Sequence, residues 1–223
     1  LAKASPAEVI TAWGRLGYPR RALRLHAAAQ IIAEDFNNQV PEDPAILQTL
    51  PGIGEYTAAA IAAFAFEKQT LVMDVNIRRL LTRVIDGNEH PKPAPTVKEK
   101  ASRLALQPSK NAHIWAAATM ELGALICTSK NPICEQCPVI GQCNWRKNGY
   151  PKTDLVRKSQ DWHGTDRKCR GTIVQALREN ESLTENAIKK LWPDESQVEK
   201  ALKTLQDDLL IEAIPRKRYR LPA

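Results

Sequence analysis

The fold is decided by the stretch LPGIGEYTAAAI, residues 50–61. Gly52 and Gly54, separated by the apolar Ile53, permit a tight turn with exposed backbone amides. The alanine-rich, largely apolar segment from Tyr56 to Phe66 predicts a helix directly after this turn. The amides and the positive dipole end of that helix would bind a phosphate beside the turn. An ordinary loop between two helices has the same pattern, so both interpretations stay open at this point.

The segments around this turn predict an all-α body. Ser5, Pro6 and Glu8 form a helix-start pattern, and apolar residues recur at helical spacing further along. Strand signals are weak in this region. We expect helices over residues 6–15, 20–35, 44–50, 56–66, 76–85, 97–106 and 112–126.

The pattern changes after Cys143. A connector with little apolar periodicity is followed by three expected helices, over 168–178, 185–192 and 195–206, and by a β-hairpin within 209–221. This order suggests a small winged-helix-like unit. The predicted domains are therefore 1–147, a basic connector over 148–164, and a C-terminal unit over 165–223. The third of these helices is acidic, which suits major-groove entry poorly, whereas the hairpin is basic. DNA contact and a packing or partner role both stay open for this unit.

The charge balance favours a polyanionic partner. The chain has 32 basic and 25 acidic residues, and the window from Trp145 to Arg170 holds eight basic residues against three acids. A solvated linker would have the same pattern. No run of apolar residues approaches the roughly 18 that a membrane span needs.

Four of the five cysteines lie within seventeen residues, in the spacing C-x6-C-x2-C-x5-C. Such a set in an intracellular protein indicates a metal site before a disulfide framework. Zinc sites usually use paired short knuckles, and only one short pair is present, so a [4Fe–4S] cluster is favoured over zinc or no metal. The loop would fix Lys130, Arg146 and Lys147 against phosphates. Its ligands would be Cys127, Cys134, Cys137 and Cys143, and Cys169 is expected to be an ordinary thiol.

An aspartate stands before the helix expected from Asn76. Asp74, within the sequence VMDVNIRR (residues 72–79), fits a helix N-cap, which contributes about 1 kcal/mol. On that residue alone the capping interpretation is favoured. The chain combines a helical array, a glycine turn, an aspartate and a cysteine loop, in a fixed order along the sequence. This combination indicates a function more specifically than any one of these features does.

These motifs resemble the endonuclease III superfamily of helix-hairpin-helix DNA glycosylases, and most closely its MutY-like adenine glycosylases. Such enzymes rotate a base out of the duplex and cut its glycosidic bond. The matching stretches cover roughly the first two-thirds of the chain: LGYPRRALRLH (16–26), LPGIGEYTAAAI (50–61), MDVNIRRL (73–80), MELGALIC (120–127) and the cysteine loop.

The resemblance implies a role for each matching residue. Asp74 would stabilise the oxocarbenium-like sugar, and Asn76 would support the site. Tyr56 occupies the position where a bifunctional branch carries a nucleophilic lysine, which implies hydrolysis with weak or no strand cleavage. Tyr18 would wedge into the base stack, although a core tyrosine is the alternative, and Arg21 would contact DNA.

The resemblance also implies a general-acid glutamate on an earlier helix, which residues 1–15 do not match. We therefore expect about the first 70 residues of a full enzyme to lie outside this chain, a size taken from the resemblance. The expected function is excision of adenine opposite 8-oxoguanine or guanine in double-stranded DNA. We expect the protein to be a cytoplasmic monomer that acts at the bacterial nucleoid and has no membrane contact. A thymine or uracil mismatch glycosylase, an inactive DNA-binding fragment and an iron–sulfur redox protein are the alternatives.

Overall fold

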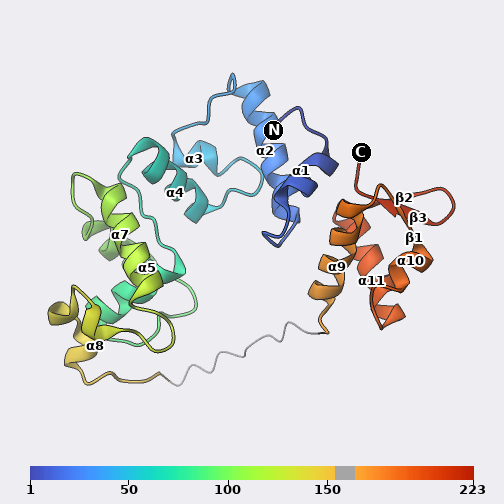
Figure 1. Cartoon of the computed structure of the whole chain (residues 1–223). Helices are drawn as coiled ribbons and strands as arrows, with labels where there is room; N and C mark the ends of the chain where they lie inside the picture. Colours follow the sequence, from blue (N-terminus) through green and yellow to red (C-terminus); the bar gives the residue numbers. More distant parts are fainter. Residues whose placement is uncertain (154–163) are drawn as a thin grey trace. The chain divides into compact units, whose positions relative to one another are not determined.

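In the computed structural model, residues 1–153 and 164–223 are described (Figure 1). The chain forms two compact units that are discontinuous in sequence. Unit 1 contains Leu1–Val40, Leu50–Gly52 and the described part of Lys158–Ala223, and unit 2 contains Pro41–Thr49 and the described part of Ile53–Arg157. The domain boundaries expected from the sequence stay a prediction, and residues 154–163 of the expected basic connector lie outside the description.

The N-terminal part of unit 1 has two helices whose starts follow from local chemistry. Helix α1 spans Pro6–Trp13, and the predicted capping box is present, with the Ser5 amide donating to Glu8 Oε2 at 2.7 Å. Helix α2 spans Arg20–Asp35, the range expected from its apolar spacing.

The C-terminal part of unit 1 contains three helices and a three-stranded antiparallel sheet in the order β1-β3-β2. The predicted hairpin is strands β2 and β3, whereas β1 was not expected. Ile10 of α1 packs in the core of these elements with Ile173, Val198 and Leu205, and Cys169 is fully buried there. The elements are α9 (Asp166–Glu179), β1 (Leu183–Thr184), α10 (Glu185–Lys189), α11 (Glu195–Asp207), β2 (Glu212–Ile214) and β3 (Arg218–Arg220).

Unit 2 is helical, and its core lies between α5 and α7, which pack side by side (Figure 1). Val72, Ile77 and Ala116 are buried in that core. The helices are α3 (Pro44–Leu47), α4 (Glu55–Phe66), α5 (Val75–Leu81), a π-helical turn η1 (Thr82–Asp86), α6 (Val97–Ala105), α7 (Ala112–Leu125), the 3-10 turns η2 (Cys134–Gln136) and η3 (Ile140–Gln142), and α8 (Asn144–Lys147).

A helix is present in each of the expected segments, and three of these helices end three or more residues earlier than expected. The helix expected over 76–85 is α-helical only to Leu81 and then widens into η1, whose C-cap is Gly87 with a φ of +70°. The helices expected over 44–50 and 185–192 stop at Leu47 and Lys189.

Within the described ranges, no helix is long and apolar enough to cross a membrane.

Candidate active site and cysteine loop

The glycine turn requires its first glycine. Gly52 has a φ of +80°, and a Cβ on it would lie 2.8 Å from Cβ of Arg24 on α2. No L side chain fits that conformation or that space without a shift. Gly54, in contrast, has open space around it and is the N-cap of α4, with its carbonyl accepting from the Ala58 amide at 2.9 Å. Both glycines are exposed and Ile53 is half-buried, so the turn presents backbone to solvent.

Tyr56 lies in the first turn of α4, and its phenol interacts electrostatically with the carboxylate of Asp74. Tyr56 is 44% exposed. Partial burial raises the pKa of its phenol above the usual value, and the negative charge of Asp74 raises that pKa further. The phenol is therefore protonated and neutral at physiological pH.

Asp74 is held rigidly at the N-terminus of α5. Its Oδ1 accepts hydrogen bonds from the amides of Asn76 (2.9 Å) and Ile77 (2.7 Å), and its Oδ2 accepts from Asn76 Nδ2 at 2.9 Å. The capping interpretation is thus confirmed, and capping leaves the carboxylate fixed in position. Asp74 is half-buried, and across the described ranges no basic side chain forms an ion pair with it.

A buried arginine connects Asn76 to the cysteine loop. Arg79 donates from Nη2 to Asn76 Oδ1 at 2.9 Å and from Nε to the backbone carbonyl of Cys127 at 2.8 Å. The same Nη2 also donates to the carbonyl of Gly123 on α7. A Cβ on Gly123 would lie 2.6 Å from the backbone oxygen of Asn76, so glycine is what lets α5 and α7 approach this closely.

A second buried arginine organises the cysteine loop itself. Arg83 is 1% exposed and donates to the backbone carbonyls of Glu89 (3.0 Å), Thr128 (2.7 Å) and Ser129 (3.3 Å). Its Nη1 also lies 3.4 Å from Sγ of Cys127. The guanidinium stacks over the Trp145 ring, 4.5 Å from the centroid. One cation therefore satisfies several backbone acceptors and faces a thiol of the expected ligand set.

The four predicted ligands share one small cavity, lined by the side chains of Cys127, Cys134, Cys137 and Cys143. All four are free thiols, and burial raises the pKa of the Cys134 and Cys137 thiols. Within 1–153 and 164–223, no three His, Cys, Asp or Glu side chains are placed to hold a single metal ion. Four thiols around one cavity, with apolar walls and a cationic neighbour, fit an iron–sulfur cluster that takes one cysteine per iron.

The other predicted DNA contacts lie at the surface of their own units. In unit 2, Lys130, Arg146 and Lys147 are exposed, and Arg146 also lines the cysteine cavity. In unit 1, Tyr18 is 59% exposed, which excludes the core-tyrosine alternative, and Arg21 lies over the Trp13 ring at 5.8 Å. The structure thus brings Tyr56, Asp74 and Asn76 together, whereas Tyr18, Arg21 and Gly52 belong to the other unit.

Sequence reasoning missed Arg79, Arg83 and Gly123. The two arginines stand four residues apart on one helical face, and a buried helix face rarely contains unpaired cations. That spacing is the signal that could have identified them.

Comparisons with known proteins identify relatives along nearly the whole chain. The HhH-GPD superfamily of base excision DNA repair proteins matches residues 1–105. Two curated relatives have 42% identity to the chain: the adenine DNA glycosylases of Mycolicibacterium smegmatis, over 99% of this chain and 75% of that protein, and of Mycobacterium tuberculosis H37Rv, over 99% and 74%. The human adenine DNA glycosylase is 40% identical over 66% of this chain and 27% of its own length.

Solved structures show the same fold. A thermostable thymine-DNA glycosylase has 25% identity and a TM-score of 0.60, over 66% of this chain and 68% of that one. Endonuclease III in a non-covalent DNA complex has 22% identity and a TM-score of 0.56, over 67% and 70%. With 42% identity along nearly its whole length to relatives of that name, the chain belongs to the adenine DNA glycosylase family of the HhH-GPD superfamily.

Proposed function

We propose that the chain binds double-stranded DNA and removes adenine mispaired with 8-oxoguanine or guanine, by hydrolysis of the N-glycosidic bond without strand cleavage. The observation that carries this proposal is the carboxylate of Asp74. Three hydrogen-bond donors hold it, no basic side chain of the described residues forms an ion pair with it, and it lies near enough to Tyr56 to perturb its pKa.

The carboxylate would act on the sugar. As the base departs, positive charge develops on the deoxyribose, and a preorganised anion in a site of low dielectric constant stabilises that charge. Because Asp74 is already held by the amides of Asn76 and Ile77, it has little reorganisation to undergo during the reaction. Asn76 orients the second carboxylate oxygen, and Arg79 in turn orients Asn76.

Tyr56 supports a monofunctional reaction. A bifunctional glycosylase needs an amine at this position to attack the sugar and form a Schiff base. A neutral phenol with a raised pKa is a poor nucleophile at physiological pH. Water is then the group that completes the substitution, which leaves an abasic site and an intact strand.

The remaining predicted residues would bind and support the DNA. Gly52, Ile53 and Gly54 expose the backbone of the turn before α4, where a phosphate fits. Cys127, Cys134, Cys137 and Cys143 would hold a [4Fe–4S] cluster, which when bound cross-links the loop and requires no redox change for that role. The loop would then present Lys130, Arg146 and Lys147 to phosphates. We interpret residues 165–223 as a winged-helix-like unit, because three helices and a hairpin occur there in that order.

A glycosylase assay tests the proposal directly. The chain is incubated with duplexes that carry A opposite 8-oxoguanine, A opposite G, or T opposite G, and abasic sites are counted after alkaline cleavage. We expect excision from the first two duplexes and no strand cut before alkali. A second candidate, thymine excision, is favoured by the likeness to the thymine-DNA glycosylase, and a cut at T opposite G alone would establish it. DNA binding without any excision would leave an inactive DNA-binding protein.

A further inference from the structure

The cysteine cavity has one wall that is neither a thiol nor an aliphatic side chain. Arg83 and Trp145 form this wall, and both side chains are buried. Arg83 directs a hydrogen-bond donor at one ligand, because its Nη1 lies 3.4 Å from Sγ of Cys127. A donor of this kind favours negative charge on the sulfur that accepts from it. The aliphatic part of the lining is Leu80, Val84, Ile126, Pro132 and Ile140.

Tyr150 packs against the indole of this wall. The rings of Tyr150 and Trp145 meet edge to face, with centroids 4.9 Å apart and planes at 85°. The Tyr150 amide donates to the Trp145 carbonyl at 2.9 Å, and the Trp145 indole donates to the Pro151 carbonyl at 2.9 Å. These two hydrogen bonds hold Tyr150 at a φ of +59°, a left-handed value that is rare for a bulky residue. The ring is therefore fixed beside the cysteine loop.

The phenol of Tyr150 interacts with both a thiol and a cation. Burial raises the pKa of the Cys134 thiol, and a hydrogen bond with the Tyr150 side chain opposes that rise. The phenol must then donate and the sulfur accept, because only such a bond favours the thiolate. Burial also raises the pKa of the phenol, and a hydrogen bond with Arg146 opposes that rise. Since arginine has no acceptor, the phenol oxygen accepts from Arg146 and keeps its hydrogen for Cys134.

We propose that Tyr150 is a positioning residue of the cysteine site, whose hydroxyl donates a hydrogen bond to the Cys134 sulfur and raises the reduction potential of the bound iron–sulfur cluster. Hydrogen bonds to the sulfurs are among the features that set this potential, and a donor stabilises the state with more negative charge. The cluster then gives up an electron less readily to an oxidant, which suits a proposed structural role. The inference rests on the proposed function for the identity of the cluster.

The test compares the cluster-containing wild type with Tyr150→Phe. Phenylalanine keeps the ring against Trp145 and removes only the donor. The midpoint potential is measured by voltammetry of the full chain without DNA. Loss of one net hydrogen bond changes the redox equilibrium constant by roughly fivefold, so the potential should fall by about 40 mV for one electron.

A second readout is the rate at which the cluster is lost to an oxidant. Ferricyanide takes one electron from each cluster and becomes ferrocyanide, and the decay of the visible absorbance is timed. We expect the absorbance of Tyr150→Phe to decay roughly fivefold faster than that of the wild type. Tyr150→Leu removes the ring as well as the hydroxyl and should have the same low potential.

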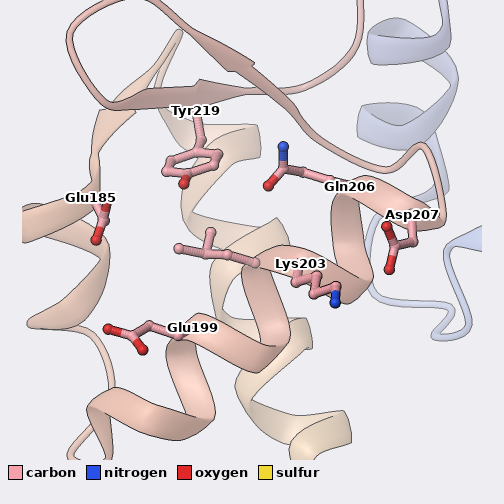
Figure 2. A pocket seen from close by; sticks show the side chains of 7 residues that line it. Glu185, Glu199, Lys203, Gln206, Asp207 and Tyr219 are labelled. Atoms are coloured by element: carbon pink, nitrogen blue, oxygen red, sulfur yellow. The ribbon is translucent and has the colours of Figure 1, made fainter.

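Tyr219→Phe is the matched control. Tyr219 lies on β3 in unit 1, and Figure 2 shows its side chain directed into a pocket with Glu185 and Glu199. Burial raises the pKa of this phenol too, but no cysteine is among the described residues that line its pocket. The control variant should therefore match the wild type in potential and in decay rate.

Three results would overturn the proposal. The first is a wild-type potential and decay rate in Tyr150→Phe, whether or not Tyr150→Leu differs, because the hydroxyl would then have no effect. The second is an equal change in Tyr219→Phe. The third is a Tyr150→Phe protein that binds no iron, because the hydroxyl would then be needed to hold the cluster rather than to set its potential.

Failure of the proposed function is measured separately. A wild type that contains zinc or no metal would overturn the cluster assignment and this inference together. A wild type with about four iron atoms and an unchanged potential in Tyr150→Phe would overturn this inference alone. Excision by the wild type on the mispaired duplexes decides the enzymatic activity in either case.

Discussion

Arg79 donates a hydrogen bond to the side-chain oxygen of Asn76 at 2.9 Å, and the other end of the same guanidinium binds the Cys127 carbonyl at 2.8 Å. Asn76 in turn binds Asp74. One buried side chain thus connects the carboxylate proposed for catalysis to the first cysteine of the loop. Hydrogen bonds connect the Cys127 carbonyl to Arg79, Arg79 to Asn76, and Asn76 to Asp74. A change at the loop can therefore alter the position of the carboxylate.

Arg79→Lys should lower the excision rate at saturating enzyme by tenfold or more, while DNA affinity changes little. An ammonium cannot bind Asn76 and two carbonyls in the geometry of the guanidinium fork. The lost charged hydrogen bonds should also reduce the free energy of unfolding by roughly 2–4 kcal/mol. Single-turnover kinetics and urea denaturation give the two quantities. The neighbouring Arg78→Lys, which keeps an ion pair with Glu99, is the control. Equal rates for the two variants would show that Arg79 has no positioning role.

Asp74→Asn should lower the excision rate by at least a factor of about 10³. Its free energy of unfolding should stay within about 1 kcal/mol of that of the wild type. Asparagine caps a helix as well as aspartate does but has no charge, so the substitution separates capping from catalysis. Asp74→Ala removes the cap as well and should cost about 1 kcal/mol more. Thermal melts and alkaline cleavage of mispaired duplexes are the measurements. Substantial excision by the asparagine variant would exclude the proposed role of the carboxylate.

Tyr56→Lys should introduce covalent chemistry. A lysine in the first turn of α4 would be placed near Asp74, where its amine can attack the sugar and form a Schiff base. Borohydride should then trap the variant on mispaired or abasic DNA, whereas wild type and Tyr56→Phe should not be trapped. The native Lys68, whose ammonium binds Glu42 at 3.0 Å, is an internal control in the wild type. If the lysine variant is not trapped either, Tyr56 does not line the reacting sugar.

The cysteine loop should bind iron. Purified without oxygen, the chain should be brown and contain about four iron atoms, one per cysteine ligand. Cys137→Ser should lose most of that iron and the visible absorbance. Cys169→Ala is the matched control, because Cys169 is fully buried in the core of the other unit, and it should keep both. A colourless protein that contains zinc would contradict the iron–sulfur assignment.

Local chemistry made much of the fold predictable. The capping box at Ser5, the cap at Asp74 and the turn at Gly52 depend on residues close in sequence, and all three are present. Long-range partners were not predictable. The acceptors of Arg79 lie up to 48 residues away, and Ile10 packs in a core formed mostly after residue 168. Such contacts depend on how helices pack, which helical periodicity in one sequence does not specify.

Gly123→Ala should destabilise unit 2. The added Cβ would lie 2.6 Å from the backbone oxygen of Asn76, a distance that real Cβ atoms essentially never show, so α5 and α7 must move apart. Overpacking of this kind costs about 1–3 kcal/mol. The separation would also pull Arg79 on α5 away from its acceptors, the carbonyls of Gly123 and Cys127. Because Arg79 orients Asn76, excision should fall together with stability. Gly171→Ala is the control, because Gly171 lies within α9 with open space around it, and alanine there should stabilise the chain by about 0.5–1 kcal/mol. Urea denaturation of both variants measures the difference, and equal stability would show that α5 and α7 do not depend on the close approach at Gly123.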